Sequence, residues 1–320
     1  FGDDQDDEIF HDLNAVGKAE LVEDFLFIDG TARISQELIS LLGSPAEADI
    51  NASNRASVGT YSLSPHIQKR LGTFADARVR YTASGAIFES DVATASDSTV
   101  NAINAGLTSG TRFNDFSWGI NYSIRKADNR DAADTTFERA VLNLGYALTR
   151  KFRVLGSVGE EWNDYPSLTE TSGPSYSLGF GFAPSRRTSI EILAGERYFG
   201  PTYNLSARHR TRSTNWDASY SEDVSDTTQL LGTSGTRYDY LCPDAEGILQ
   251  PVLDWPFSTP PAPDCTISNP VGTPGLVFDL RSGVFISKTL RAGVNWQLRK
   301  MNYALSVSDS RRLYTSADAE

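Results

Sequence analysis

The chain has 320 residues, a formal net charge of −12 at pH 7, a mean hydropathy of −0.33 and 39% apolar residues. No stretch approaches the roughly 20 apolar residues of a membrane-spanning helix, so helical spanning is excluded. The acidic balance argues against a general nucleic-acid-binding protein. A transmembrane strand needs only about 9 to 11 residues, half of them polar, so this composition fits a soluble β-protein and a membrane β-barrel equally well.

The N-terminal segment is acidic and opens with FGDDQDDE, which does not resemble a signal peptide. We expect residues 1–20 to form a partly flexible periplasmic arm. Calcium binding by its carboxylates is the alternative, but their spacing does not match an EF-hand loop, and we predict no metal or cofactor. Residues 21–320 are predicted to form a single domain.

From Leu26 onward, apolar and polar side chains alternate with a period of two, which places successive side chains on opposite faces of a strand. The segment 113–150 is the clearest example. Its first half places Trp118 and Tyr122 on one face and Asn121 and Arg125 on the other.

This alternation predicts about 14 strands. The predicted strands are 26–40, 56–70, 74–90, 97–109, 113–127, 135–148, 152–164, 174–183, 187–199, 202–211, 214–225, 276–287, 290–299 and 301–314. Short turns near residues 72, 111, 150, 185, 212 and 289 alternate with mostly longer connections, with tight exceptions near 200 and 300.

An even strand count with short turns at one end and long loops at the other is typical of outer-membrane barrels, whereas a soluble sandwich has no reason to sort its loops in this way. The polar face would also be unusual in a sandwich core. We therefore predict an all-β, transmembrane antiparallel up-and-down β-barrel. Its long loops would be extracellular, its short turns periplasmic, and both chain termini would lie on the short-turn side.

The two faces then have different roles in the predicted barrel. The side chains predicted to line the lumen are Asp76, Arg78, Arg80, Asn121, Arg125, Glu191, Arg197, Arg208, Arg210, Asp217, Asn295 and Arg299. The aromatic side chains predicted to face lipid are Trp118, Tyr122, Tyr146, Trp216, Tyr220 and Trp296.

Residues 223–275 interrupt the alternation and are predicted to form a long extracellular loop. The segment holds both cysteines of the chain, and seven of the 14 prolines lie between Pro243 and Pro270. A disulfide between Cys242 and Cys265 would close this loop and stabilise the fold by roughly 3 kcal/mol, as suits an oxidising exterior. Two unpaired thiols are the alternative. The cysteines lack the CxxC spacing or histidine partners of a zinc site.

Several segments resemble a known family. They are LVEDFLFIDGTARISQELI, INASNRASVGTYSLSPHIQKRLG and YFGPTYNLSARHRTRSTNWDASYSEDVS, with the sharpest motifs at YSLSP, GPTY and WDASYSEDV. Between about Leu21 and Thr228 the chain is similar to the uncharacterised outer-membrane β-barrel proteins associated with PEP-CTERM and exopolysaccharide systems of Gram-negative bacteria. The resemblance implies an outer-membrane location and no established activity. The cysteine- and proline-rich insert does not belong to the family pattern.

Three functions are open at this point. The barrel could be a pore for polar solutes or an export-associated barrel, since charged side chains of both signs line the lumen. Alternatively, those charges could pair and plug the lumen of a structural barrel, which would contact lipopolysaccharide, other barrels or surface polysaccharide. The third, an enzyme, would need a histidine beside a serine or carboxylate; only His11, His66 and His209 are available, and we do not predict an enzyme.

Overall fold

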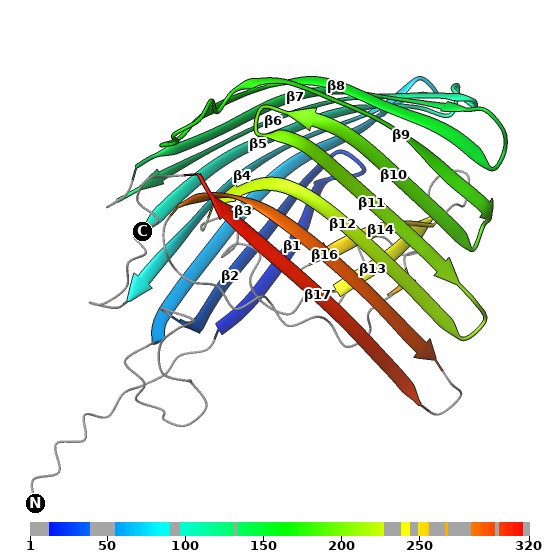
Figure 1. Ribbon diagram of the computed structural model, residues 1–320. Helices are drawn as coiled ribbons and strands as arrows, with labels where there is room; N and C mark the ends of the chain where they lie inside the picture. The colour runs from blue at the N-terminus through cyan, green and yellow to red at the C-terminus, as the bar shows by residue number, and fades with distance from the viewer. Residues whose placement is uncertain are drawn as a thin grey trace, which may run out of the picture.

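The structure is a computed structural model that describes residues 13–38, 55–89, 97–130, 133–226, 238–243, 249–255, 266–267, 283–297 and 301–315. The described chain is all-β (Figure 1). None of the described residues belongs to a helix that could cross a membrane. The strands are β1 (Leu13–Val22), β2 (Leu26–Leu38), β3 (Arg55–Leu71), β4 (Ala75–Glu89), β5 (Ser98–Ser109), β6 (Phe116–Asn129), β7 (Thr135–Ala147), β8 (Phe152–Asp164), β9 (Gly173–Ser185), β10 (Thr188–Arg197), β11 (Gly200–Arg210), β12 (Thr214–Asp226), β13 (Tyr238–Pro243), β14 (Leu249–Trp255), β15 (Thr266–Ile267), β16 (Val284–Gln297) and β17 (Asn302–Tyr314).

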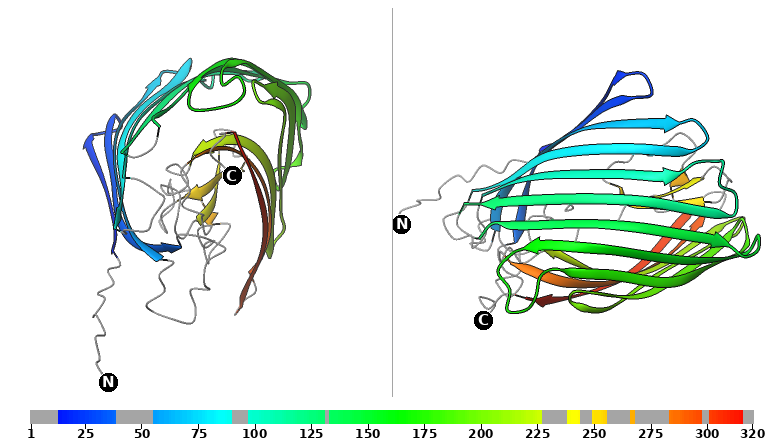
Figure 2. Two further views of the ribbon diagram at one scale, coloured as in Figure 1. Left: turned by 60° about the vertical axis from the view of Figure 1, so that its left-hand side comes forward. Right: turned by 90° about the horizontal axis from the view of Figure 1, so that it is seen from above.

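Fourteen of these strands form one sheet, in which each strand pairs with its neighbour along the chain. The order is β1 to β12 followed by β16 and β17, and every pairing is antiparallel. This confirms the predicted up-and-down architecture and the strand count. The sheet is strongly curved, with β1 and β17 as its two edges (Figure 2). Among the described residues no ladder joins these two edges.

The connections differ in length at the two ends of the sheet. At one end, called the short-turn end below, the connections are 23–25, 72–74, 110–115, 148–151, 186–187, 211–213 and 298–301. The other end, called the long-loop end, carries 39–54, 90–97, 130–134, 165–172 and 227–283, together with the tight connection 198–199 between β10 and β11. The predicted sorting of loop lengths therefore holds in general, although 198–199 is tight and 110–115 is slightly longer than 130–134.

The N-terminal segment differs from the prediction. Residues 13–22, expected to belong mostly to a flexible arm, form β1 and pair with β2 through a tight turn at 23–25, where Asp24 has a φ of 54°. The strand signal of this segment is weak, because the middle of its apolar face carries only the small residues Ala15, Gly17 and Ala19. Residues 1–12 lie outside the described residues.

A second difference concerns β16. The ranges 276–287 and 290–299 were predicted as two strands with a turn near residue 289, but Val284–Gln297 is one strand. Lys288 interrupts the apolar alternation between Ile286 and Leu290, so the sequence pattern here is weaker than in most of the other strands. In the structure Lys288 stays in the ladder opposite Glu222, and its Nζ lies 3.3 Å from Glu222 Oε1.

These two corrections change the end of the sheet at which the first strand begins and the last strand ends. One strand is gained at the start and one is lost near the end, so the count of 14 is unchanged. However, β1 now begins and β17 now ends at the long-loop end (Figure 1). The prediction that the first strand begins and the last strand ends on the short-turn side is therefore wrong, and the periplasmic placement of the arm stays a prediction.

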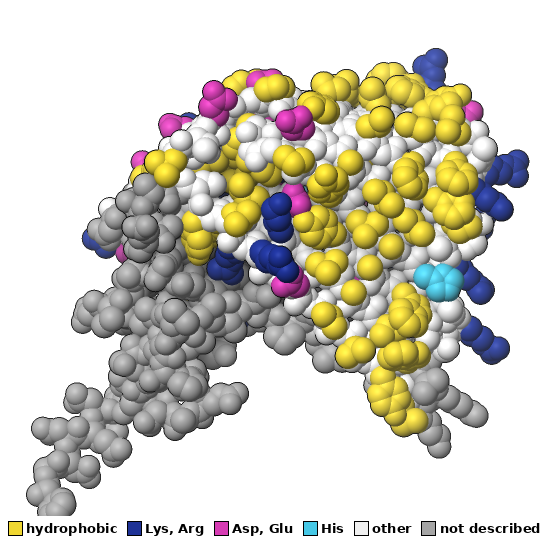
Figure 3. Space-filling model, in the orientation of Figure 1, with side chains coloured by type: hydrophobic (Ala, Val, Ile, Leu, Met, Phe, Trp, Pro, Cys, Tyr) yellow, Lys and Arg dark blue, Asp and Glu magenta, His cyan; other side chains and the backbone are white. Residues whose placement is uncertain are grey.

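The two faces of the sheet have opposite chemistry. The convex face carries the exposed apolar side chains, among them Leu63, Val79, Ile120 and Leu178, which are between 47% and 68% exposed. Figure 3 shows apolar side chains spread over the convex face. The concave face carries the polar and charged side chains that alternate with them. An apolar outer face around a polar inner face is the pattern of a transmembrane barrel and the reverse of a soluble sheet core.

The sheet rolls in on itself at the long-loop end (Figure 2). Val224 of β12 and Val284 of β16 are buried in one cluster with Tyr165, and Phe137 packs against it. Phe137 lies on the concave face of β7, so the ends of β12 and β16 lie inside the curve formed by β6 to β8.

The insert between β12 and β16 contains structure that the sequence did not predict. Residues 223–226 belong to β12, and β13, β14 and β15 form a small separate sheet in the order β14-β13-β15. This small sheet lies on the concave side of the large one (Figure 2). Cys265 lies outside the described residues, so the predicted disulfide with Cys242 stays a prediction.

A first prediction concerns the two edges. In lipid each unsatisfied backbone group costs several kcal/mol, so in the membrane we expect the edges to pair. Hydrogen exchange of the protein in lipid nanodiscs, followed by mass spectrometry, should then show β1 and β17 protected as strongly as the interior strand β6. If alternate amides of β1 exchange as fast as the turn at 72–74, the edge is open and the expectation is wrong.

Candidate functional site

The concave face is the candidate functional surface. Eleven of the twelve predicted lumen-lining residues lie in described strands, and all eleven take the positions that alternate with the apolar convex side chains. They are Asp76, Arg78, Arg80, Asn121, Arg125, Glu191, Arg197, Arg208, Arg210, Asp217 and Asn295. Arg299 lies outside the described residues. The concave placement of this set is a property of the structure; contact with a solute stays a prediction.

The six predicted lipid-facing aromatic residues all lie on the convex face, at positions that alternate with the concave residues. They are Trp118, Tyr122, Tyr146, Trp216, Tyr220 and Trp296. Tyr146 and Trp216 are 52% and 47% exposed. Contact with lipid stays a prediction.

Towards the long-loop end, tyrosines on the convex face are fixed by carboxylates. The Tyr122 hydroxyl donates a hydrogen bond to Glu138 at 2.8 Å, Tyr176 donates to Glu196, and Tyr220 donates to Glu222. The Tyr122 and Tyr176 pairs mark where the apolar convex surface gives way to polar side chains, whereas the Glu222 side chain is only 2% exposed and lies where β12 rolls inward. Such amphipathic tyrosines are typical of a membrane–water interface.

The densest charge network on the concave face surrounds Glu161 of β8, whose side chain is only 2% exposed. Arg197 of β10 binds it with two parallel hydrogen bonds, from Nε to Oε1 at 2.6 Å and from Nη2 to Oε2 at 2.8 Å. The same guanidinium donates to Asp223 of β12 at 2.8 Å. A bidentate arginine–carboxylate pair of this kind is both strong and geometrically specific. The network therefore ties β8, β10 and β12 together across the curve of the sheet.

Arg139 of β7 completes the network in a different way. Its Nε lies 3.5 Å from Glu161 Oε1, which is long for a hydrogen bond, and this buried nitrogen makes no hydrogen bond in the described part of the chain. The Arg139 side chain is 37% exposed, compared with 11% for Arg197. Arg139 is thus held beside Glu161 while its guanidinium remains accessible.

A second tie crosses the curve at the long-loop end. Arg125 of β6 lies 2.5 Å from Asp226 at the end of β12, and the Thr135 hydroxyl donates to the same carboxylate at 3.3 Å. Next to it, the hydroxyls of Tyr165 and Tyr198 lie 3.0 Å apart, and burial raises the pKa of both phenols. These contacts hold the rolled-in end of β12 against β6, β7 and the loop 165–172.

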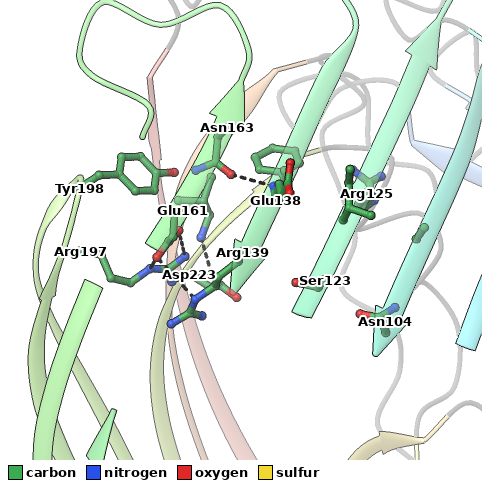
Figure 4. Close-up of a pocket in the computed structure, with 14 residues that line it drawn as sticks. Asn104, Ser123, Arg125, Glu138, Arg139, Glu161, Asn163, Arg197, Tyr198 and Asp223 are labelled. Atoms are coloured by element: carbon green, nitrogen blue, oxygen red, sulfur yellow. Dashed lines mark hydrogen bonds and ion pairs between the residues drawn. The ribbon is translucent and has the colours of Figure 1, made fainter. Parts of the chain in front are cut away.

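Side chains of the Glu161 network, together with Arg125 and Tyr198, line a cavity of about 300 Å³ on the concave face (Figure 4). Its lining includes Asn104, Ser123, Arg139, Glu161 and Asp223, which come from five different strands. Its size is at the lower limit of ordinary small-molecule pockets.

A separate polar network lines the concave face of β2 to β4. Arg80 Nη1 donates to Asp29 at 2.8 Å, and Arg78 donates to Gln68 at 3.0 Å. His66 Nδ1 lies 3.6 Å from Asp29, and the imidazole stacks on Phe27 with ring centroids 5.1 Å apart.

The histidines give little support to catalysis. The Ser64 hydroxyl, which is close to His66 in the sequence, pairs instead with the Thr82 hydroxyl at 2.9 Å. His209 Nδ1 lies 2.8 Å from the Thr188 hydroxyl at the short-turn end. His11 is not among the described residues. Within the described ranges no three histidine, cysteine or carboxylate side chains group so that they could hold a metal ion.

Sequence reasoning missed several members of the site. Arg125 and Arg197 were predicted to line the lumen, whereas Glu161, Arg139, Asp223 and Asp226 were not. Glu161 and Arg139 fall on the concave face by the same period-two alternation as the predicted lumen-lining residues, so the sequence contains the pattern that places them there. Asp223 and Asp226 fell in the segment read as a loop. The pairing of Asp226 with Arg125, 101 positions away, has no signal in a single sequence.

Comparisons with known proteins give little beyond the fold. No protein-family model matches the chain, and no curated protein matches it. Solved structures of outer-membrane transporters do. Two are variants of the FrpB iron transporter from Neisseria meningitidis, with TM-scores of 0.46 (F3-3) and 0.44 (F5-1 apoprotein), each with 9% identity. A third is the siderophore receptor PirA from Pseudomonas aeruginosa, with a TM-score of 0.38 and 13% identity. The matches cover 92% to 94% of this chain and 50% to 51% of those chains. The chain therefore spans about half the length of those proteins, and no substrate or activity follows from the similarity.

A second prediction tests the Glu161 network. The substitution Glu161→Gln removes the carboxylate that neutralises Arg197, and we expect it to lower the free energy of unfolding by about 3 kcal/mol or more. Urea unfolding in detergent micelles, followed by tryptophan fluorescence, measures this. The matched control is Glu160→Gln. Glu160 is the neighbouring residue on the convex face and makes no ion pair among the described residues, so this substitution should change stability by about 0.5 kcal/mol or less. Equal losses in the two variants would show that Glu161 has no special role.

A third prediction concerns the Tyr165–Tyr198 pair. Because burial raises both phenol pKa values in the folded state, this stabilisation is fully present below the unfolded pKa of about 10 and is lost as the pH rises above it. We expect the double variant Tyr165→Phe/Tyr198→Phe to lose less stability than the unchanged protein between pH 8 and pH 11. The same urea titration at both pH values measures this. If both proteins lose the same amount, ionisation of the pair does not limit stability.

Proposed function

We propose that this protein is an outer-membrane β-barrel that conducts polar solutes through a narrow lumen. The observation that carries the proposal is the division of the sheet into an apolar convex face and a concave face of ion pairs and hydrogen-bonding side chains. In a bilayer this arrangement places the apolar face against lipid and the polar face around water. Pairing of β1 with β17 would complete the wall, because the strand count is even and these two edges run antiparallel.

The lumen would be narrowest at the long-loop end. There the ends of β12 and β16 lie inside the curve of the sheet. Asp223 binds Arg197 of β10, and Asp226 binds Arg125 of β6 across the curve. The small sheet of β13 to β15 lies on the same concave side and would reduce the opening further. A disulfide between Cys242 and Cys265 would fit this arrangement, since Leu241 pairs with Thr266 at the adjacent position of each strand.

The same contacts favour a second candidate function. If the ties across the curve are permanent, the lumen is plugged and the barrel is a structural element of the outer membrane. It would then act through its surface contacts with lipopolysaccharide, other barrels or surface polysaccharide. Under either function, we propose from the sequence resemblance that the protein acts together with an exopolysaccharide or PEP-CTERM system.

A fourth prediction separates the two candidates. The purified protein in a planar lipid bilayer should show small single-channel currents. The double variant Asp223→Asn/Asp226→Asn should conduct more, because it breaks the ties that hold β12 across the lumen. Asp128→Asn is the control, because Asp128 lies at an exposed position of β6 and makes no ion pair across the lumen within the described residues; it should leave the current unchanged.

The folding of each protein is checked by its resistance to SDS before boiling, which is the behaviour expected of a closed barrel. If the unchanged protein and the double variant both fold and both remain silent in the bilayer, the pore proposal is wrong and the structural function stands.

A further inference from the structure

The cavity on the concave face contains hydrogen-bonding groups that the folded chain does not use. They form a row across three neighbouring strands, because Asn104 of β5 pairs with Ser123 of β6, and Ser123 pairs with Arg139 of β7. In the described part of the chain neither Asn104 nor Ser123 makes a side-chain hydrogen bond, and the Arg139 guanidinium has only the long approach to Glu161. Figure 4 shows these three residues on successive strands beside the Glu161 network.

The neighbouring charges explain why Arg139 remains available. Both oxygens of Glu161 accept hydrogen bonds from Arg197, and Asp226 is held by Arg125 and Thr135. The strong pairs of the network therefore form without Arg139. Its Nε is buried beside Glu161, which fixes the position of the guanidinium at the edge of the cavity.

The space in front of this row is kept open by small side chains. Ala102 and Ser123 line the cavity together with Asn104, and no bulky side chain of β5 lies among its lining. Neighbouring strands are about 4.8 Å apart, so the row from Asn104 to Arg139 spans about 10 Å of the wall. That length suits a small molecule with an acidic group at one end and hydroxyl groups along its body.

We propose that Arg139, Ser123 and Asn104 form a binding subsite for a polyhydroxylated solute that carries an oxyanion, either a carboxylate or a phosphate. The guanidinium of Arg139 binds the oxyanion through its fork of N–H donors, which matches the geometry of both groups. Ser123 and Asn104 exchange hydrogen bonds with the hydroxyl groups of the solute. The subsite rests on the proposed function, because it makes the lumen selective for acidic, sugar-like solutes.

The same row continues on the other side of Asn104. Arg80 of β4 pairs with Asn104, and His66 of β3 pairs with Arg80. Arg80 is bound to Asp29, so it is less available than Arg139. The row is therefore directional, with its accessible cation at the Arg139 end, and the oxyanion binds there.

The test measures binding directly, in detergent micelles by isothermal titration calorimetry, with sodium glucuronate, glucose 6-phosphate and glucose as probes. We expect glucuronate or glucose 6-phosphate to bind and glucose to bind at least tenfold more weakly. Arg139→Gln should weaken binding of the acidic probe by tenfold or more, since a charged hydrogen-bonded pair is lost. Ser123→Ala should weaken it by a smaller factor.

The control is Arg153→Gln. Arg153 also lies on the concave face, but it is already in contact with Glu191 and lies outside the cavity lining. It should leave the affinity for the acidic probe unchanged. If Arg153→Gln weakens binding as much as Arg139→Gln does, the anion is attracted by the general charge of the wall and the subsite is wrong.

The failure of this inference can be told apart from the failure of the proposed function. If acidic probes bind through Arg139 but no variant conducts in a bilayer, the subsite stands and the pore does not. If the protein conducts but neither acidic probe binds more tightly than glucose, Arg139 only balances the charges of Glu161 and Asp223, and the inference is overturned.

Discussion

The alternation of side chains along an extended strand is the constraint on which this structure depends. Successive side chains point to opposite faces, so a strand with apolar residues at every second position gives the sheet one apolar and one polar face. Fourteen neighbouring strands keep the same alternation in register. Trp118 and Leu144 therefore meet on the convex face, while Ser123 meets Arg139 on the concave one.

The polar face can then be curved only if its charges are compensated. Curvature brings side chains of distant strands together, and an arginine such as Arg197 meets the carboxylates of Glu161 and Asp223 rather than water. Breaking such a pair is costly because it leaves a buried charge uncompensated. Curvature also needs close approach of the backbone. On the concave side of β9 and β10, a Cβ atom at Gly179 or Gly195 would lie only 2.0 or 2.1 Å from a backbone oxygen.

The contacts at the long-loop end connect the fold to its proposed role. The ties of β12 to β6 and β10 hold part of the sheet inside its own curve, and three of their side chains, Arg125, Arg197 and Asp223, also line the cavity beside Arg139. Stability and access to the lumen therefore depend on the same charges. The barrel is a pore if these ties open and a plugged scaffold if they stay closed. Replacing Asp223 and Asp226 therefore discriminates between the two functions.

The sequence by itself determined the fold class, most of the strands, the general sorting of connections by length and the face on which each described lumen residue lies, because all of these follow from local alternation and turn composition. The predicted count of 14 strands agrees with the structure because one missed strand and one divided strand cancel. The sequence pattern failed where local signals were ambiguous: the small side chains of β1 hid a strand, and Lys288 weakened the alternation inside β16. Only the tertiary structure decided which charges pair, that the ends of β12 and β16 roll inward, and that Arg139 remains available. Those features depend on contacts between strands far apart in the chain, such as that of Arg125 with Asp226, and local periodicity contains no information about them.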